Sequence, residues 1–156
     1  MELLWNRDGG ILTYNGKSIR VLCLVRNELN GLRAISEKPV FSEDEEGGTG
    51  VPYMPRLFPK GSWTVETILP KDNPYEAPQF ISTNAHQLVD EWSVEDGHYG
   101  KPTGNHVEDW GYGLHNSSSS TTLGCGHILE SQDRAGLVAT IEDAWSRGEN
   151  VTLEVV

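Results

Sequence analysis

Apolar residues at the start of the chain come in short runs divided by polar turns, a pattern typical of strands rather than helices. The runs occupy residues 3–5, 11–14 and 18–25, and the sequences Asp8-Gly9-Gly10 and Asn15-Gly16 separate them. Asn-Gly between two apolar runs is the strongest short signal for a β-hairpin. The pattern therefore predicts that the chain begins with paired strands.

Two further stretches predict strands that bury one face. Over residues 62–69, Trp63 and Val65 alternate with polar residues. Over residues 151–155, valine and leucine occupy every second position. Alternation with a period of two places one set of side chains against the core and the other in solvent.

Two stretches have the spacing of amphipathic helices. The first covers residues 84–92 and follows polar residues that can cap a first turn. The second begins at Ser131 and stops at Gly148. The apolar stripes are Leu88, Val89 and Trp92 in the first stretch, and Leu137, Val138, Ile141, Ala144 and Trp145 in the second.

The segment 110–115 alternates in a way that matters for chemistry. A strand here would place Trp110, Tyr112 and Leu114 on one face and His115 on the other. We therefore expect His115 at the open end of a strand whose opposite face is packed.

Glycine, proline and acidic residues predict loop insertions around 42–57 and 93–109. Four consecutive acidic residues, Glu43 to Glu46, indicate a solvated loop, because the ordered ligand pattern of a calcium loop is missing. The length of 156 residues suits one domain with its own core. We therefore predict a single domain over 1–156, mainly β with one or two helices (α+β).

The composition of the chain restricts the classes of partner that it can bind. The net charge of −11 argues against nucleic acid, since phosphate binding requires a concentrated basic surface. Residues 1–5 lack the features of a secretory signal, and no run approaches the roughly 20 apolar residues of a membrane span. We expect a chain made in the cytoplasm without a signal peptide.

The strongest chemical candidate is Cys125, which follows His115 by ten positions. A polar loop of asparagine, serines and threonines joins them and can bring its two ends together. A nearby base is needed because only a few per cent of an ordinary thiol is thiolate at neutral pH. Gly124 and Gly126 lack a Cβ and would let a substrate or an anion approach the backbone N–H groups.

Other interpretations of these residues stay open. A cysteine between glycines is often a buried small hydrophobe, and Cys23, inside an apolar run, has a predicted core role. A metal hydrolase is a further alternative, but the histidines lack the i, i+4 pairing of zinc proteases and no Cys-x-x-Cys is present. The five histidines are His86, His98, His106, His115 and His127. We expect no metal and no cofactor.

The second half of the chain resembles the catalytic pattern of the L,D-transpeptidase (YkuD-like) family. The resemblance lies in Leu114-His115, a short loop, Thr122-Leu123-Gly124-Cys125, the following helix and the last valine-rich strand. Upstream, Phe58 to Val65 resembles a conserved strand of that family, and Gly10 to Gly16 resembles its opening hairpin. The resemblance implies a YkuD-like β-sandwich or barrel.

The resemblance also implies roles for individual residues. Cys125 would be the nucleophile and His115 its base, with the main-chain carbonyl of Asn116 orienting the imidazole. The oxyanion and substrate site would be formed by Thr122, Gly124, Gly126 and His127. The chain departs from the pattern at Leu123, where commoner members have histidine, and at Gly126-His127, where they have a hydrophobic residue and then arginine or asparagine.

The activity that the resemblance implies is acyl transfer on peptidoglycan stem peptides, as transpeptidation, D-amino-acid exchange, or carboxypeptidase or endopeptidase cleavage. The protein would then act in the periplasm or cell wall after delivery by another system, and an immunity protein or a delivery apparatus would be its partner. Relatives of this kind include bacterial effectors and phage-associated proteins. The alternative is a catalytically inactive cell-wall-binding or virion module on the same fold, which the departure at Leu123 motivates.

Overall fold

Eight strands of this chain close into a barrel in the computed structural model, which describes residues 1–23, 40–41, 52–53, 57–70, 79–95, 98–116 and 124–156. In barrel order the strands are β1 (Glu2–Asn6), β12 (Thr152–Val155), β6 (Gly61–Leu69), β7 (Phe80–Thr83), β10 (Gly113–His115), β11 (Gly126–Ile128), β3 (Lys17–Cys23) and β2 (Ile11–Tyr14). The pairs β1–β12 and β10–β11 are parallel. The prediction of a mainly β fold with a helix is confirmed.

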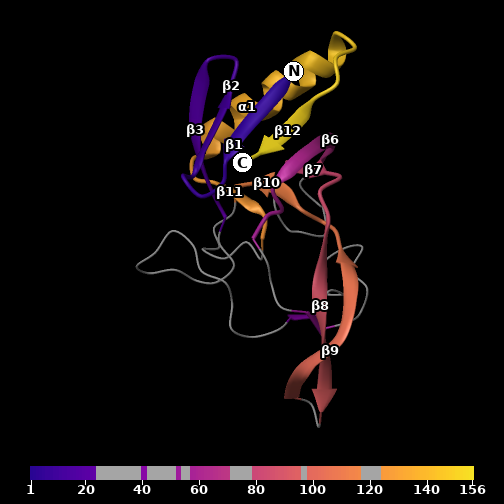
Figure 1. The fold of residues 1–156 in the computed structure, drawn as a ribbon. Helices are drawn as coiled ribbons and strands as arrows, with labels where there is room; N and C mark the ends of the chain where they lie inside the picture. Colours follow the sequence, from indigo (N-terminus) through magenta and orange to yellow (C-terminus); the bar gives the residue numbers. More distant parts are fainter. Residues whose placement is uncertain (24–39, 42–51, 54–56, 71–78, 96–97, 117–123) are drawn as a thin grey trace.

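A second, four-stranded sheet has the order β4 (Val40–Phe41), β5 (Pro52–Tyr53), β8 (Gln87–Glu95) and β9 (His98–Asp109). Figure 1 shows the long β8–β9 pair extending away from the barrel, on the side of β7 and β10. The barrel strands β7 and β10 lead directly into and out of this pair, so it adjoins the end of the barrel that holds β10 and β11.

The opening hairpin forms as predicted. β2 and β3 pair across Asn15-Gly16, where both residues have positive φ values of 48° and 76°. Positive φ at both central residues is what a type I′ turn requires, and asparagine and glycine tolerate it best. The turn fixes the register that directs Leu12 and Tyr14 into the core.

One continuous apolar core fills the barrel and extends beneath α1 (Ser131–Ser146). The predicted stripe is confirmed, because its members Leu137, Val138, Ile141 and Ala144 are buried. The helix begins after Glu130, without the side-chain cap expected of Ser131, and the chain turns at Gly148 with φ of 77°. Among the described residues, no helix is long and apolar enough to cross a membrane.

The predicted helix at 84–92 is wrong, because these residues enter β8. Leu88 and Val89 point to opposite sides of the strand, so Leu88 is 60% exposed whereas Val89 is 1% exposed. The apolar spacing suits either structure over so few residues, and pairing with β9 outweighs the local preference.

The segment 93–109, predicted to be a loop, contributes the end of β8 and all of β9 in the described residues. Pro102 and Gly104 argued against a strand in the sequence, because neither residue favours the regular hydrogen-bond ladder of a sheet. The β8–β9 pairing accommodates them with two register shifts, one on each side of Trp92. Irregularities of this kind absorb residues that a regular ladder excludes.

The predicted strand at 110–115 is shorter than expected. Gly111 has φ of 94°, and β10 therefore starts at Gly113. Tyr112 and Leu114 are buried as predicted, whereas Trp110 lies before the break and is 44% exposed. The apolar alternation therefore begins at Trp110, before the point at which the backbone enters the strand.

Candidate active site

The register of β10 and β11 determines how Cys125 lies relative to His115. Leu114 is opposite Gly126, and His115 is opposite His127, in a parallel pair. Counting back one residue puts Cys125 level with Gly113. His115 and His127 share the outer face of the barrel, and Cys125, which immediately precedes β11, lies on that face because it packs against Phe80, whose ring stacks on His115.

This outer face is organised as two neighbouring rows that cross the strands. In the first row, His127 is paired with His115 on one side and Leu22 on the other. Phe80, at the start of β7, continues the row beyond His115, because Ile81 is paired with Leu114. The second row holds Gly113 and Cys125, so Cys125 is diagonal to His115, at roughly 8 Å between Cα atoms for ordinary strand spacing.

Phe80 connects the two rows. Its ring stacks on the imidazole of His115, with 5.5 Å between centroids and 22° between planes, and it packs against Cys125. The ring leans over Gly113, where a Cβ would lie 2.4 Å from two ring carbons. Only glycine therefore fits at position 113, and the phenyl ring touches both candidate catalytic side chains.

His115 is buried between two rings. Phe80 covers one side and His127 lies on the other, with 6.4 Å between the histidine centroids and 16° between planes. Burial, and next the charge of His127, lower the pKa of His115 to about 4. Its Nδ1 has no hydrogen-bond partner among the described residues. His115 is consequently a neutral imidazole near pH 7, in the protonation state of a base.

Cys125 is 5% exposed, and its thiol donates to the main-chain oxygen of Gly111 at 3.6 Å. Both cysteines of the chain are free thiols. Gly126 is paired with Cys23, whose side chain lies in the barrel core. Cys23 and Cys125 therefore point to opposite faces of the sheet, a geometry that cannot close a disulfide without backbone movement.

A buried polar network holds the segment that accepts the thiol of Cys125. The hydroxyl of Tyr112 donates to Asp109 at 2.5 Å and accepts from Nε2 of Gln87 at 2.7 Å. The main-chain oxygen of Tyr112 accepts from Thr83 Oγ1 at 2.6 Å. Asp109 is 5% exposed, so its carboxyl group belongs to the interior. Satisfied buried networks of this kind rigidify the backbone that they contact.

Cys23 links the core to Gly124, the residue before Cys125. Its thiol donates to the main-chain oxygen of Gly124 at 3.3 Å and accepts from the N–H of Phe58 at 3.2 Å. Burial raises the pKa of Cys23 to about 11, which makes it a poor nucleophile. The predicted core role of Cys23 is confirmed, and its sulfur also satisfies two backbone groups.

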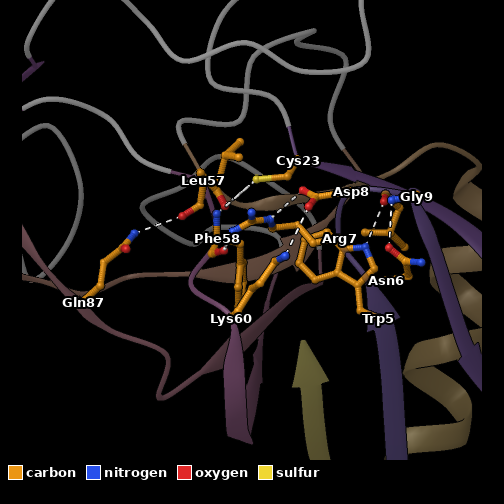
Figure 2. A network of polar contacts seen from close by, with 12 residues as sticks. Trp5, Asn6, Arg7, Asp8, Gly9, Cys23, Leu57, Phe58, Lys60 and Gln87 are labelled. Atoms are coloured by element: carbon orange, nitrogen blue, oxygen red, sulfur yellow. Dashed lines mark hydrogen bonds and ion pairs between the residues drawn. The ribbon is translucent and has the colours of Figure 1, made fainter. Parts of the chain in front are cut away.

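The backbone at 57–58 is fixed at several points (Figure 2). Besides the bond to Cys23, Arg7 Nη1 donates to the oxygen of Phe58 at 2.8 Å, and Gln87 Nε2 donates to the oxygen of Leu57 at 3.0 Å. Gln87 thus joins this segment to the tyrosine network. The contact therefore links residues 57–58 to the network that holds the backbone beside Gly111, whose oxygen accepts the thiol of Cys125.

The peptide between Gly124 and Cys125 has a defined direction. The oxygen of Gly124 faces Cys23, in the core. In a trans peptide the C=O and the following N–H point in opposite directions. No cis peptide bond occurs in the described residues, so the N–H of Cys125 points away from the thiol of Cys23.

Asn116 and Gly126 have structural contacts. The side chain of Asn116 donates to the oxygens of Ile128 and Leu129, at 2.7 and 3.2 Å, and ties the ends of β10 and β11 together. The main-chain carbonyl of Asn116 is expected to orient the imidazole of His115, and within the described residues Nδ1 of His115 has no hydrogen-bond partner. A Cβ on Gly126 would lie 2.4 Å from Leu114 Cδ2, so its missing side chain leaves room in the core.

Thr122 and Leu123 lie outside the described residues. Among those described, no three histidine, cysteine or acidic side chains gather to hold a metal ion. The sequence reasoning missed Phe80, Gly113 and the Asp109–Tyr112–Gln87 network. The Gly-x-Gly spacing at 111–113 was the available signal for a close approach, whereas the network depends on pairing between distant strands.

Comparisons of the chain with protein-family models, with curated proteins and with solved structures found no match. A function for this chain must therefore be argued from its motifs and from the geometry of the outer face.

Proposed function

We propose that this chain is a cysteine-dependent acyl-transfer enzyme that acts on peptidoglycan stem peptides through a thioester on Cys125. The observation that carries the proposal is the common face of His115, on β10, and Cys125, immediately before the adjacent parallel strand β11, with Phe80 packed against both. The stem peptide as substrate comes from the motif resemblance to L,D-transpeptidases. No step requires a metal or an organic cofactor.

In the first half-reaction, the thiol of Cys125 turns from the oxygen of Gly111 towards the first row, and His115 takes its proton. The sulfur attacks the carbonyl carbon of an amide next to a D-amino acid. The C–N bond breaks, and the imidazolium returns its proton to the leaving amine. A thioester on Cys125 remains.

In the second half-reaction, an acceptor attacks the thioester carbon while His115 takes the acceptor's proton and passes it to the sulfur. An amine acceptor gives exchange or cross-linking, and water gives hydrolysis. The N–H of Cys125, next to the reacting sulfur, would donate to the tetrahedral oxyanion in both steps. A backbone donor of this kind typically contributes a factor of about 100 to 1,000 to the rate.

Peptidoglycan lies outside the cytoplasmic membrane, so the site of action in this proposal is the periplasm or the cell wall. Another system would deliver the protein there. A delivery apparatus and an immunity protein are the partners consistent with that route.

The test is to incubate wild type, Cys125→Ala and His115→Gln with purified muropeptides that carry tetrapeptide stems, and to follow the products by mass. Loss or exchange of the terminal D-residue by wild type alone supports acyl transfer. An intact-mass adduct on wild type that Cys125→Ala lacks identifies the thioester. Unchanged muropeptides with wild type would overturn the proposal.

A matched variant makes the test specific. His106→Gln removes an exposed histidine on β9, paired with Asp90, and should retain the activity. Loss of activity in this control would indicate a general structural effect rather than the proposed chemistry.

A second candidate function is a wall-binding module that uses the same face without catalysis. The observation that favours it is the burial of Cys125, whose thiol donates to a main-chain oxygen. Sedimentation with whole sacculi tests this function. Co-sedimentation that Cys125→Ala leaves unchanged, together with intact muropeptides, would support the module.

A further inference from the structure

Three aromatic rings pack against one another, from the core outwards, at the junction of the barrel and the β8–β9 pair. Trp63 packs at the edge of the core, His86 lies against it, and Trp110 lies on His86. The centroids of His86 and Trp110 are 4.2 Å apart with 22° between planes, whereas His86 meets Trp63 edge-on at 5.3 Å and 61°. We call these three residues the aromatic platform.

The inner part of the platform is fixed. The indole N–H of Trp63 donates to the oxygen of Pro59 at 2.9 Å, and its ring lies over Gly61, where a Cβ would be 3.1 Å away. Asn84 exchanges main-chain and side-chain hydrogen bonds with Thr64 on β6, at 3.0 and 2.7 Å. These contacts hold the turn that carries His86.

Trp110 forms the outer surface of the platform. It is 44% exposed, although His86 covers one face of its indole. A ligand that packs on Trp110 would therefore reach the indole at its other face or at its edges. An exposed tryptophan that is already immobilised by stacking loses little conformational entropy when a ligand packs on it.

His86 has a defined tautomer. Its Nδ1 lies 2.9 Å from the oxygen of Asn84, and a carbonyl oxygen only accepts, so Nδ1 carries the proton. In the neutral ring Nε2 is then an acceptor, on the edge that points away from Asn84. The platform thus combines a flat apolar face with a hydrogen-bond acceptor beside it.

The chemistry of this surface selects among ligands with flat apolar faces. The net charge of −11 disfavours nucleotides and other polyanions. An ammonium group is bound best by several rings that enclose it, whereas the platform offers one exposed ring. A neutral pyranose ring presents C–H groups to the electron-rich indole face and hydroxyl or acetamido donors at its rim, which match Nε2.

We propose that the aromatic platform of Trp63, His86 and Trp110 binds a pyranose ring of a neutral, N-acetylated glycan. The platform adjoins the candidate active site, because Trp110 precedes Gly111, whose oxygen accepts the thiol of Cys125. Where the sugar belongs to peptidoglycan, which rests on the proposed function, the glycan strand would hold its stem peptide beside Cys125.

The test uses the β-1,4-linked tetramer of N-acetylglucosamine, which carries no peptide. Calorimetric titration of wild type should show saturable binding, and the indole N–H resonance of Trp110 should shift in the NMR spectrum. Trp110→Ala should weaken the affinity by about tenfold, from the loss of stacking and buried area. His86→Phe keeps a ring but removes Nε2, and should weaken the affinity about threefold.

The control variant is Leu88→Ala, which removes an exposed apolar side chain on the neighbouring strand and should bind as wild type does. Absence of saturable binding by wild type, or binding that Trp110→Ala leaves unchanged, would overturn the inference. The NMR shift in wild type provides a readout that does not depend on any variant's folding.

The two proposals fail separately. Binding of the tetramer without any change in muropeptides would retain the platform and reject acyl transfer. Cleavage of muropeptides without tetramer binding would retain acyl transfer and reject the platform.

Discussion

The burial of His115 should make the stability of this protein depend on pH between about 6.5 and 4. Burial, and then the charge of His127, lower the pKa of His115 to about 4 in the folded chain. In the unfolded chain the pKa returns to about 6.5. The unfolded state therefore binds the proton more readily, so this stabilising contribution is complete above pH 6.5 and is lost as the pH falls towards 4.

The size of the effect follows from the two pKa values. Each pH unit within this window changes the free energy of unfolding by about 1.4 kcal/mol. From about pH 7.5 to about pH 5, the titration of His115 alone should remove about 2 kcal/mol. Domains are typically stable by only about 5–15 kcal/mol, so the loss is measurable.

Urea denaturation of wild type and His115→Gln, followed by tryptophan fluorescence, measures this contribution. Glutamine does not titrate, so wild type should lose about 2 kcal/mol more than the variant between about pH 7.5 and pH 5. The subtraction cancels the carboxylates common to both proteins. Leu88→Ala, which removes an exposed side chain that does not titrate, should keep the slope of wild type. Parallel curves for wild type and His115→Gln would refute the reasoning.

Three further substitutions probe the support of the site. Gly113→Ala should destabilise the fold by about 2–3 kcal/mol, because the new Cβ would lie 2.4 Å from Phe80 ring carbons. Cys23→Ala should cost about 1–3 kcal/mol by leaving two backbone groups without the sulfur, and in the native protein Cys23 should resist alkylation. Tyr112→Phe should cost about 1–3 kcal/mol, since the buried carboxyl group of Asp109 loses the hydroxyl that donates to it.

Urea midpoints measure all three changes, and each has an outcome that contradicts it. In the control Gly136→Ala, in α1, the added Cβ would have its nearest neighbour at 3.5 Å, so this change should be neutral or slightly stabilising. Equal stability of Gly113→Ala and Gly136→Ala would mean that Phe80 moves aside freely. Native-state alkylation of Cys23 at the rate of a peptide thiol would contradict its burial. An unchanged midpoint for Tyr112→Phe would show that water replaces the hydroxyl.

Local chemistry determined the elements that the sequence predicted correctly. Asn15-Gly16 selects its turn through positive φ, and the stripe that includes Leu137 and Ile141 selects its helix through spacing. The segment 84–92 resembled a helix over too few residues to decide. Its partner, β9, begins only at His98 and carries Pro102 and Gly104, so no local pattern indicated the pairing.

The candidate site likewise has one feature that the sequence could predict and others that depend on the pairing of distant strands. The chemistry of Cys125 and His115 suggested that they act together, and their short separation in sequence required them to lie near one another. Their diagonal placement depends on the register of β10 against β11, which no local pattern encodes. The position of Phe80 over Gly113 depends in addition on β7, which comes more than thirty residues earlier in the chain.

The environment of His115 also constrains how the proposed chemistry can start. Proton transfer from an ordinary thiol, with a pKa near 8.5, to an imidazole with a pKa of about 4 is unfavourable by about 6 kcal/mol. The free protein would then hold a neutral thiol and a neutral imidazole rather than an ion pair. Proton transfer would accompany attack on a bound carbonyl, whose developing negative charge stabilises the imidazolium nearby. The burial of Cys125 and His115 would limit reaction of the thiol with electrophiles in solution, and in the proposed reaction it would favour a substrate that reaches both rows.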